Sequence, residues 1–327
     1  MVRSRQVNAL ATLGGYIGMN AGLVLTAESE DEVAAVMAHE IAHVTQRHIV
    51  RAVEAAQRDQ IPILLGMLAG AIAAQSAGSG DGAEAAIAAG LGLMAQRQIN
   101  HTRAAEHEAD RLGIQTLARA GYDPDAMANF FGRMGRITRS SGGDGGIPDF
   151  LRTHPVTTTR ISEARDRAQR MRQEPPMAYA SRGGAYSHPL LPAGLALELA
   201  AFDAVRQSHR FDLARERLRV LTARSPRQAV DEYRRIGEGA ERGLTDAQGY
   251  GYALARIRHG QAAAAAAELQ GLIERHPGDY WLVLALAEAQ HQAGDHATAF
   301  ETFETLHRSM PTNLATSLSY AQALNET

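Results

Sequence analysis

Apolar residues recur at helical spacing directly after residue 29 of the chain. The group that carries this pattern consists of Val33, Val36, Met37, Ile41 and Val44. Ser29 precedes the group and Glu32 follows Ser29 by three residues, which is the arrangement of a capping box at a helix N-terminus. The spacing predicts a long helix from about Glu30 to Gln57, and a second helix from about Gln98 to Thr116.

Residues 7–27 do not show the helical spacing of apolar residues and are typical of extended structure with turns. Side chains that favour strands stand here among glycines that mark tight bends: Tyr16, Ile17, Val24, Leu25 and Thr26. We therefore expect a short hairpin or an edge strand in this segment.

Two apolar segments lie between the predicted helices, at Ile61–Ala74 and Ala83–Ala95. A helix needs about 20 apolar residues to span a bilayer, so neither segment spans one alone. The pattern favours a buried or partly mobile helical hairpin. The alternative is a flap that makes peripheral contact with a membrane surface, or with an outer-membrane client, through residues 61–95.

The end of the chain contains an internal repeat. Gly260 and Gly294 are 34 residues apart, as are Pro277 and Pro311. This is the period of tetratricopeptide (TPR) repeats, which are helix pairs that stack and leave a concave face for a peptide or a partner helix. A helical bundle in which the interval is coincidental is the alternative.

The segment between the two parts is rich in proline and glycine and has no periodicity. We place the domain boundary there. The expected organisation is an N-terminal domain over residues 1–172, a linker over 173–193 and a TPR-like helical repeat domain over 194–327.

The composition supports a folded, mostly helical protein. Aromatic residues make up 5% of the 327 residues, and the 36 acidic and 33 basic side chains leave a net charge of −3. This balance gives no reason to expect a nucleic-acid partner. The predicted fold class is α+β and mostly helical, with an N-terminal domain carrying a small edge sheet, followed by an all-α TPR superhelix. The chain has no cysteine, so a metal ion must be held by histidine and carboxylate.

The first predicted helix contains an HExxH motif, His39-Glu40-Ile41-Ala42-His43. Residues four apart lie on the same helix face, so the imidazoles of His39 and His43 can meet one zinc ion. Glu40 lies beside them and can activate a water molecule. A hydrolytic zinc site also needs a third protein ligand and an open position for water.

The third ligand is expected on the second predicted helix, where several candidates stand close together. Glu106 and Asp110 are one turn apart, so one carboxylate can bind the metal while the other accepts the N–H of a ligand imidazole. Glu108 competes for the ligand role, and His107 is a weaker candidate. Spacing favours Glu106, because only Glu106 pairs with Asp110.

These motifs resemble those of a family of zinc metallopeptidases that includes the CAAX prenyl endopeptidases, HtpX and the BepA-like proteases with TPR repeats. Five segments carry the resemblance: Asn8–Ala9, Gly14–Ile17, Gly22–Leu23, Ala38–His48 and Glu106–Gly113, the last with an ExEAD sequence. The similarity extends over nearly the whole chain. HExxH alone indicates only a zincin, and the further motifs and the repeats restrict the resemblance to this family. The resemblance implies a zincin-type metallopeptidase domain over residues 1–172.

The resemblance implies roles for particular residues. His39, His43 and Glu106 would bind one Zn²⁺ per chain, Glu40 would be the general base, and Asp110 would support a ligand histidine. The resemblance also implies that a substrate peptide adds as a further strand to the edge formed by Tyr16, Ile17, Gly18, Met19 and Asn20.

Two residues further along the chain match the family as well. His154 corresponds to a loop histidine that can occupy the open position of the zinc and hold the enzyme in check. Arg160 follows at the spacing of the family and is a candidate for transition-state support. The alternative for His154 is a residue at the start of a helix, far from the metal.

The resemblance implies a periplasmic location. The family normally has a secretory signal and a helical segment before the residues that match Asn8. The apolar stretch Ala9–Leu25 is interrupted by glycines and no small-residue cleavage site closes it. We therefore expect no signal peptide in this chain.

The expected function is zinc-dependent hydrolysis of peptide bonds in unfolded or misassembled proteins. By resemblance these are outer-membrane proteins, and the repeats bind clients or partners such as the outer-membrane assembly machinery. The alternative is a TPR chaperone or interaction protein with a latent or inactive metal site. A fourth protein ligand that closes the site permanently would favour this alternative.

Overall fold

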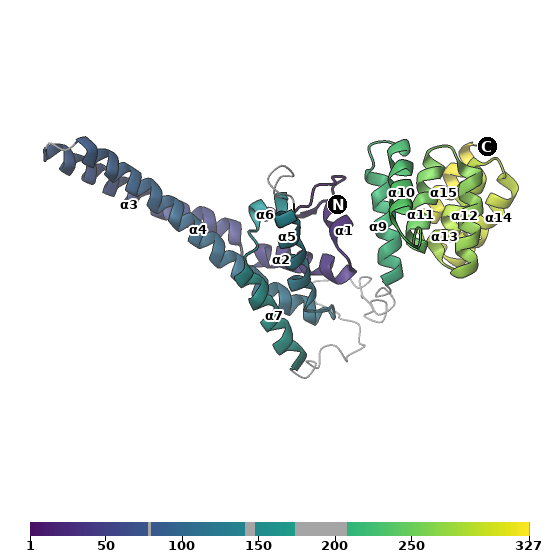
Figure 1. The fold of residues 1–327 in the computed structure, drawn as a ribbon, viewed down its shortest axis with the longest axis horizontal. Coiled ribbons are helices and arrows are strands. Elements are labelled where there is room, and N and C mark those ends of the chain that lie inside the picture. The colour runs from purple at the N-terminus through teal and green to yellow at the C-terminus, as the bar shows by residue number, and fades with distance from the viewer. Residues whose placement is uncertain (78–79, 141–147, 174–207, 327) are drawn as a thin grey trace. The chain divides into compact units, whose positions relative to one another are not determined.

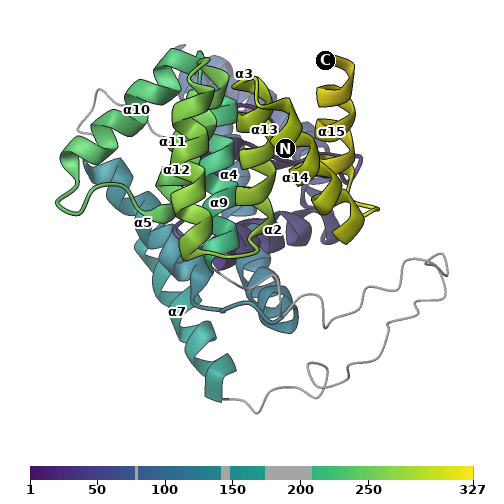
Figure 2. The ribbon, with the colours of Figure 1, turned by 90° about the vertical axis from the view of Figure 1, so that its right-hand side faces the viewer.

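The computed structural model describes residues 1–77, 80–140, 148–173 and 208–326. Contacts divide the chain into two compact units (Figures 1 and 2). The first unit comprises Met1–Val2, Gln6–Leu23 and Glu30–Ala196, and the second comprises Arg3–Arg5, Val24–Ser29 and Leu197–Thr327. Residues 174–193 of the predicted linker lie outside the described residues.

The first unit begins with a small sheet. Strands β1 (Ala9–Ala11) and β2 (Ile17–Met19) pair antiparallel, with Ala9 opposite Met19. Helix α1 (Ala21–Thr26) follows at once. The expectation of strand structure at residues 24–26 is therefore wrong. The backbone N–H of Leu23 donates to the Asn20 carbonyl at 3.1 Å, so the chain turns into a helix directly after β2.

The first predicted long helix is in fact two helices, α2 (Glu30–Thr45) and α3 (His48–Ser76). Arg47 stands between them in the left-handed conformation, with φ of 54° and ψ of 40°. Among the described residues it is the only residue other than glycine with a positive φ. This conformation ends the helical direction of α2 and sets a new one for α3, so the expectation of one helix from Glu30 to Gln57 is wrong.

The second predicted helix is longer than expected. Helix α4 (Gly80–Arg119) packs against α3 in its first half and against α2 in its second half (Figure 1). A backbone contact fixes the second of these approaches. A Cβ atom added at Gly113 would lie 3.2 Å from both the backbone N and the Cα of His39. Glycine therefore permits α4 to lie directly against the part of α2 that carries the HExxH motif.

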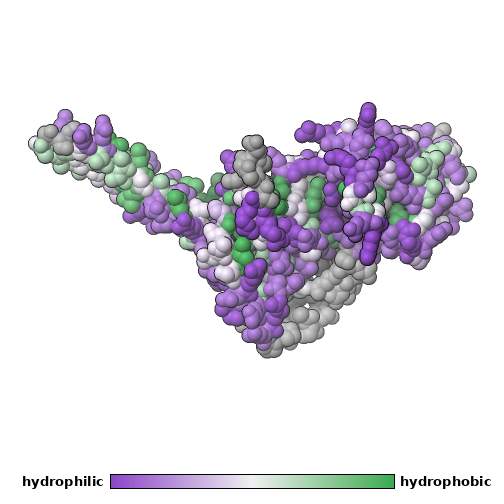
Figure 3. All heavy atoms as spheres, in the orientation of Figure 1, coloured by the Kyte–Doolittle hydropathy of each residue, from purple (hydrophilic) through white to green (hydrophobic). Residues whose placement is uncertain are grey.

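Helices α3 and α4 form the predicted hairpin, but most of its large apolar side chains are exposed. The expectation that the hairpin is buried is therefore wrong, and its partial mobility stays a prediction. The exposed fractions lie between 45% and 66% for Ile61, Leu64, Leu65, Leu68, Ile72, Ile87, Leu91 and Leu93. The hydrophobic surface is visible in Figure 3. The two helices approach each other closely at glycines. A Cβ added at Gly70 would lie 2.9 Å from Ala86 Cβ, and Met67 of α3 packs directly against Gly90 of α4.

Contact of the hairpin with a membrane surface stays a prediction. None of the helices in the described parts of the chain has the length and apolar character that crossing a bilayer requires.

Three further helices follow in the described part of the first unit: α5 (Ala126–Ser140), α6 (Asp149–Thr153) and α7 (Thr158–Gln173). Helix α5 packs on α2 and α7, and α7 also packs on α4. The core contains side chains that are at most 1% exposed: Leu23, Ile114, Leu117, Phe130, Phe131, Met134 and Phe150. These side chains come from α1, α4, α5 and α6.

In its described part the second unit consists mainly of helices. They are α9 (Ser208–Thr222), α10 (Pro226–Gly239), α11 (Asp246–Arg258), α12 (Ala262–Arg275), α13 (Tyr280–Gln292), α14 (His296–Ser309) and α15 (Leu314–Glu326). Helices α11, α13 and α15 begin at intervals of 34 residues. Gly260 and Gly294 take equivalent turns, with φ of 80° and 90°. The predicted fold class, mostly helical with a small sheet and a helical C-terminal region, is confirmed.

We predict that Gly113→Ala lowers the stability of the first unit. The added methyl group meets backbone atoms of α2, which cannot move aside as a flexible side chain can. Overpacking of this kind costs about 1–3 kcal/mol in the free energy of unfolding. Urea denaturation of both proteins measures the difference.

Gly92→Ala is the matched control, because Gly92 is also in α4 and no described atom lies within 4 Å of the added Cβ. Replacing an unhindered helical glycine stabilises by about 0.5–1 kcal/mol. Equal stability of Gly113→Ala and the wild type would contradict the close approach of the two helices.

Candidate metal centre

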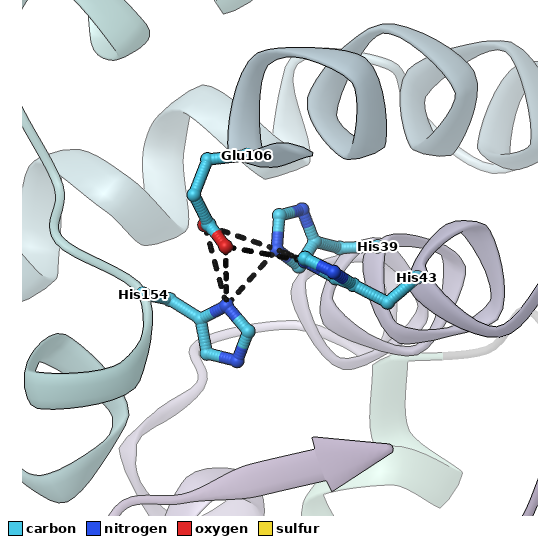
Figure 4. Close-up of side chains that lie close together, drawn as sticks. All are labelled: His39, His43, Glu106 and His154. Atoms are coloured by element: carbon cyan, nitrogen blue, oxygen red, sulfur yellow. Dashed lines mark hydrogen bonds and ion pairs between the residues drawn. The ribbon is translucent and has the colours of Figure 1, made fainter. Parts of the chain in front are cut away.

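Two histidines on α2 and a carboxylate on α4 face one another inside the first unit (Figure 4). His39 and His43 are one helical turn apart, so their rings project from the same face of α2. Glu106 projects from α4 toward both rings. His39 is 1% exposed and Glu106 is 4% exposed, so the cluster is closed off from bulk water.

The distances within this cluster match those between the ligands of a tetrahedral metal ion. His39 Nε2 lies 3.0 Å from His43 Nε2. The carboxylate of Glu106 lies 3.3 Å from His43 Nε2 and 3.5 Å from His39 Nε2. Ligand atoms at zinc-like bond lengths of 2.0–2.1 Å stand about 3.3 Å apart around a tetrahedron. The residues present therefore fit such an ion.

His154 contributes a fourth ligand atom to the same group. It follows α6, where its backbone N–H donates to the Phe150 carbonyl at 2.8 Å. Its Nδ1 lies 3.4 Å from His39 Nε2 and 3.1 Å from Glu106 Oε1. The four ligand atoms of His39, His43, Glu106 and His154 all lie within 4.8 Å of one another. His154 is thus at the cluster and not far from it.

Glu40 is a buried carboxylate beside the four ligand candidates. It is 1% exposed, and its Oε1 lies 3.4 Å from His154 Nε2. In the described parts of the chain neither of its carboxylate oxygens has a hydrogen-bond partner. Burial raises the pKa of Glu40, against the opposite effect of His154 and His39. Such a carboxylate is suited to accept a proton from a molecule that enters the site.

Asp110 contacts the outer nitrogen of His39. The distance from its Oδ1 to His39 Nδ1 is 3.0 Å, so the inner nitrogen, Nε2, faces the cluster. Arg160 donates to both oxygens of Asp110 at 2.7 Å. This arrangement holds the imidazole ring in one orientation.

Arg160 also reaches the ligand candidate Glu106. Its Nη1 lies 2.8 Å from Glu106 Oε2 and donates to the Pro155 carbonyl at 2.8 Å. Its guanidinium group stacks over Phe131, 4.7 Å from the ring centre. All of its nitrogens contact oxygens of the protein, which favours holding carboxylates in place over contacting a substrate.

The charges of the cluster depend on one another. Burial alone would lower the pKa of His39, but Asp110 and Glu106 outweigh burial and raise it to about 9. Burial lowers the pKa of His43 to about 4, against the effect of Glu106. Burial would raise the pKa of Glu106, yet its hydrogen bonds with the three histidines hold it well below its usual range. Contacts with Arg160 likewise lower the pKa of Asp110 despite its burial.

The other two candidates for the third ligand lie elsewhere. Glu108 accepts a hydrogen bond from Arg51 at 2.8 Å and lies 3.1 Å from His48. His107 pairs with Glu163 at 3.1 Å. The sequence patterns assigned no role to His48. The positions of His48, five residues after His43, and of Glu108, two residues after Glu106, were the signals that could have pointed to this contact.

The predicted substrate edge is strand β2 with its flanking residues, from Tyr16 to Asn20. β1 pairs with one side of β2, and on the other side the N–H of Val2 donates to the Met19 carbonyl at 2.8 Å. A Cβ added at Gly15 would lie 3.6 Å from Val44 on α2, so this hairpin packs next to the helix that carries the histidines. Addition of a peptide to this edge stays a prediction.

A fold of this kind, with HExxH on α2 and the facing carboxylate on α4, agrees with the comparison to known families. The model of peptidase family M48 matches residues 1–168, and the chain belongs to this family. A second family model, the bacterial transcriptional activator domain, matches residues 197–324 in the helical C-terminal region.

Individual relatives have names that refer to proteases. The chain is 38% identical over 175 residues to the beta-barrel assembly-enhancing protease of Yersinia pestis, covering 54% of this chain and 35% of that protein. It is 32% identical over 281 residues to the protein of the same name from Escherichia coli K12, covering 86% and 51%. It is 28% identical over 166 residues to the metalloprotease LoiP of Escherichia coli K12, covering 50% and 60%.

The chain spans about a third to a half of the length of the assembly-enhancing relatives. The family is therefore established by the comparison, whereas the activity, substrates and partners of the whole protein are matters of proposal.

We predict that the affinity of the cluster for Zn²⁺ rises with pH. In the metal-free protein His39 carries a proton below its pKa of about 9, and His43 is neutral above its pKa of about 4. A metal ion binds only the unprotonated ring, so binding releases one proton and the dissociation constant falls about tenfold per pH unit between these limits. Titrations with Zn²⁺ at pH 6, 7 and 8 measure this slope. An affinity that is constant over this range would contradict a protonated His39.

Proposed function

We propose that the chain is a zinc-dependent metalloendopeptidase in which His39, His43 and Glu106 bind the ion. One observation carries the proposal: the ligand atoms of these residues stand at tetrahedral spacing beside Glu40, a buried carboxylate without a hydrogen-bond partner among the described residues. Membership of peptidase family M48 supports it. When bound, the zinc ion would supply Lewis acidity toward water and a peptide carbonyl.

The remaining roles, proton transfer and orientation of the ligands, belong to side chains of the protein. Glu40 takes the proton from the attacking water and then delivers it to the leaving amine, because burial raises its pKa and makes it a better base. Asp110 holds the Nδ1 side of His39, and Arg160 holds the carboxylates of both Asp110 and Glu106. These contacts fix the ligands in the orientation that the metal requires.

We infer that the substrates are unfolded or misassembled proteins, outer-membrane proteins among them, and that the protein acts in the periplasm. The names of the relatives, which refer to assembly of a beta-barrel, support this inference. A substrate peptide would lie along β2, where the exposed side chain of Tyr16 begins the edge. The helix pairs of the second unit, with their period of 34 residues, are proposed as TPR repeats that bind clients or the assembly machinery.

His154 is proposed to keep the resting enzyme latent. Its Nδ1 takes the fourth ligand position, which a hydrolytic site keeps open for water, and its Nε2 lies against Glu40. Displacement of the segment after α6 would open both the metal and the general base. The same contact supports the alternative function, a binding protein with an inactive metal site, if His154 never leaves.

We predict that Glu40→Gln abolishes cleavage and leaves zinc binding intact. The amide fills the same space but cannot accept the proton, and loss of a general base costs about 10²–10⁴ in rate. Cleavage of unfolded casein and the zinc content of the purified protein measure the two effects. Glu163→Gln, which changes an exposed carboxylate outside the cluster, is the control. Equal cleavage by Glu40→Gln and the wild type would reject the mechanism.

We predict that His154→Ala raises basal proteolysis. Removing the imidazole frees the fourth position in every molecule, so the rate rises by the reciprocal of the open fraction, about tenfold if roughly one molecule in ten is open. The casein assay at equal zinc occupancy measures this. An unchanged or lower rate would count against latency, and no cleavage by either protein would favour the binding function.

A further inference from the structure

His48 contacts the outer nitrogen of His43. The two Nδ1 atoms lie 2.9 Å apart, and the ring centres are 4.8 Å apart with planes at 78°. The inner nitrogen of His43, Nε2, faces His39 and Glu106. His48 is 4% exposed, so its ring has been taken out of water and must find its partners within the protein.

The contacts continue from His48 to the surface. Its Nε2 lies 3.1 Å from Glu108 Oε2, and Arg51 donates to the same oxygen at 2.8 Å. The chain of contacts therefore runs from His43 through His48 to Glu108, with Arg51 at its end.

This chain of contacts allows one arrangement of protons on neutral rings. An ionised carboxylate only accepts, so the Nε2 of His48 carries hydrogen and donates to Glu108. The Nδ1 of His48 is then an acceptor, and the Nδ1 of His43 must donate to it. The hydrogen of His43 is thereby held on Nδ1, which leaves the lone pair of its Nε2 directed into the cluster.

The helix break at Arg47 permits the contact between the rings of His43 and His48. In an uninterrupted helix, residues 43 and 48 would be about 140° apart around the axis and could not face each other. The left-handed conformation of Arg47 ends α2 and starts α3 at His48. The chain thus adopts a costly backbone conformation at the one point that brings the His48 ring over His43.

We propose that His48 is a positioning residue that fixes the tautomer and orientation of His43 for metal binding, with Glu108 orienting His48 in turn. The inference rests on the proposed function, in which His43 is a metal ligand. Each of the two helical ligand histidines then has its own partner on the outer nitrogen: Asp110 for His39 and His48 for His43.

The test is the affinity of the metal-free protein for Zn²⁺, measured by competition with a chromogenic chelator. His48→Phe keeps a buried ring and removes the acceptor, so we expect the dissociation constant to rise about 10- to 100-fold, as for other partners of ligand histidines. His48→Asn keeps an acceptor near the position of Nδ1. Its affinity is expected to stay closer to that of the wild type than to that of His48→Phe.

The second unit offers a matched control. His291 Nδ1 lies 3.0 Å from His296 Nδ1, and its Nε2 lies 3.4 Å from Glu326, so a similar chain of contacts occurs there. His291→Phe should leave the zinc affinity unchanged. Far-UV circular dichroism and unfolding midpoints of the metal-free proteins show whether each variant is folded.

A measurement on the unaltered protein covers the case in which His48→Phe does not fold. Nitrogen NMR of the zinc-loaded wild type should find hydrogen on Nδ1 of His43 and on Nε2 of His48. Hydrogen on Nδ1 of His48, or an affinity of His48→Phe equal to that of the wild type, would overturn the inference while the proposed function stands. Failure of the wild type to bind Zn²⁺ would overturn both.

Discussion

The burial of charged side chains beside three histidines is the constraint on which the rest of the first unit depends. Glu106, Asp110 and Arg160 are each less than 5% exposed. Removing such groups from water costs several kcal/mol per ion unless each has a well-placed partner. Arg160 forms ion pairs with the carboxylates of Glu106 and Asp110, and these carboxylates contact the imidazole rings. The cluster is thus stable only as a whole, and the helices that carry it must meet in one arrangement.

That arrangement depends on three features of the backbone near the cluster. The glycine at position 113 lets α4 approach the backbone of His39. The left-handed residue at position 47 ends α2 and turns the next ring toward His43. The segment after α6 brings His154 to the ligand group. Three of the four candidate ligands are thus held on long helices, whereas the fourth stands on the short segment between α6 and α7.

The hairpin of α3 and α4 differs from the core of the first unit in where its apolar side chains lie. Its helices meet closely at glycines, where Gly70 faces Ala86 and Gly90 faces Met67, and most of the larger aliphatic side chains point outward. Apolar composition alone indicated burial, because in most soluble proteins such segments are covered. To cover these side chains, another helix or strand would have to pack on the hairpin. Among the described elements, α3 packs mainly on α4.

The sequence by itself determined what depends on local geometry. The HExxH spacing fixed His39 and His43 on one face, since the angle between residues of a helix is set by its own hydrogen bonds. The i+4 relation of Glu106 and Asp110 is local in the same sense. The helices that carry the HExxH motif and Glu106 and the interval of 34 residues also followed from pattern, whereas α1 did not.

Only the tertiary structure decided which faces of these elements meet. The face of α4 turned toward α2 carries Glu106, while Glu108 lies with His48 outside the ligand group. The place of His154 beside residues more than 100 positions earlier could be read from a resemblance but not from local spacing. The physical reason is that hydrogen bonds within a helix fix angles along one segment, whereas packing between distant segments depends on every side chain at their interface.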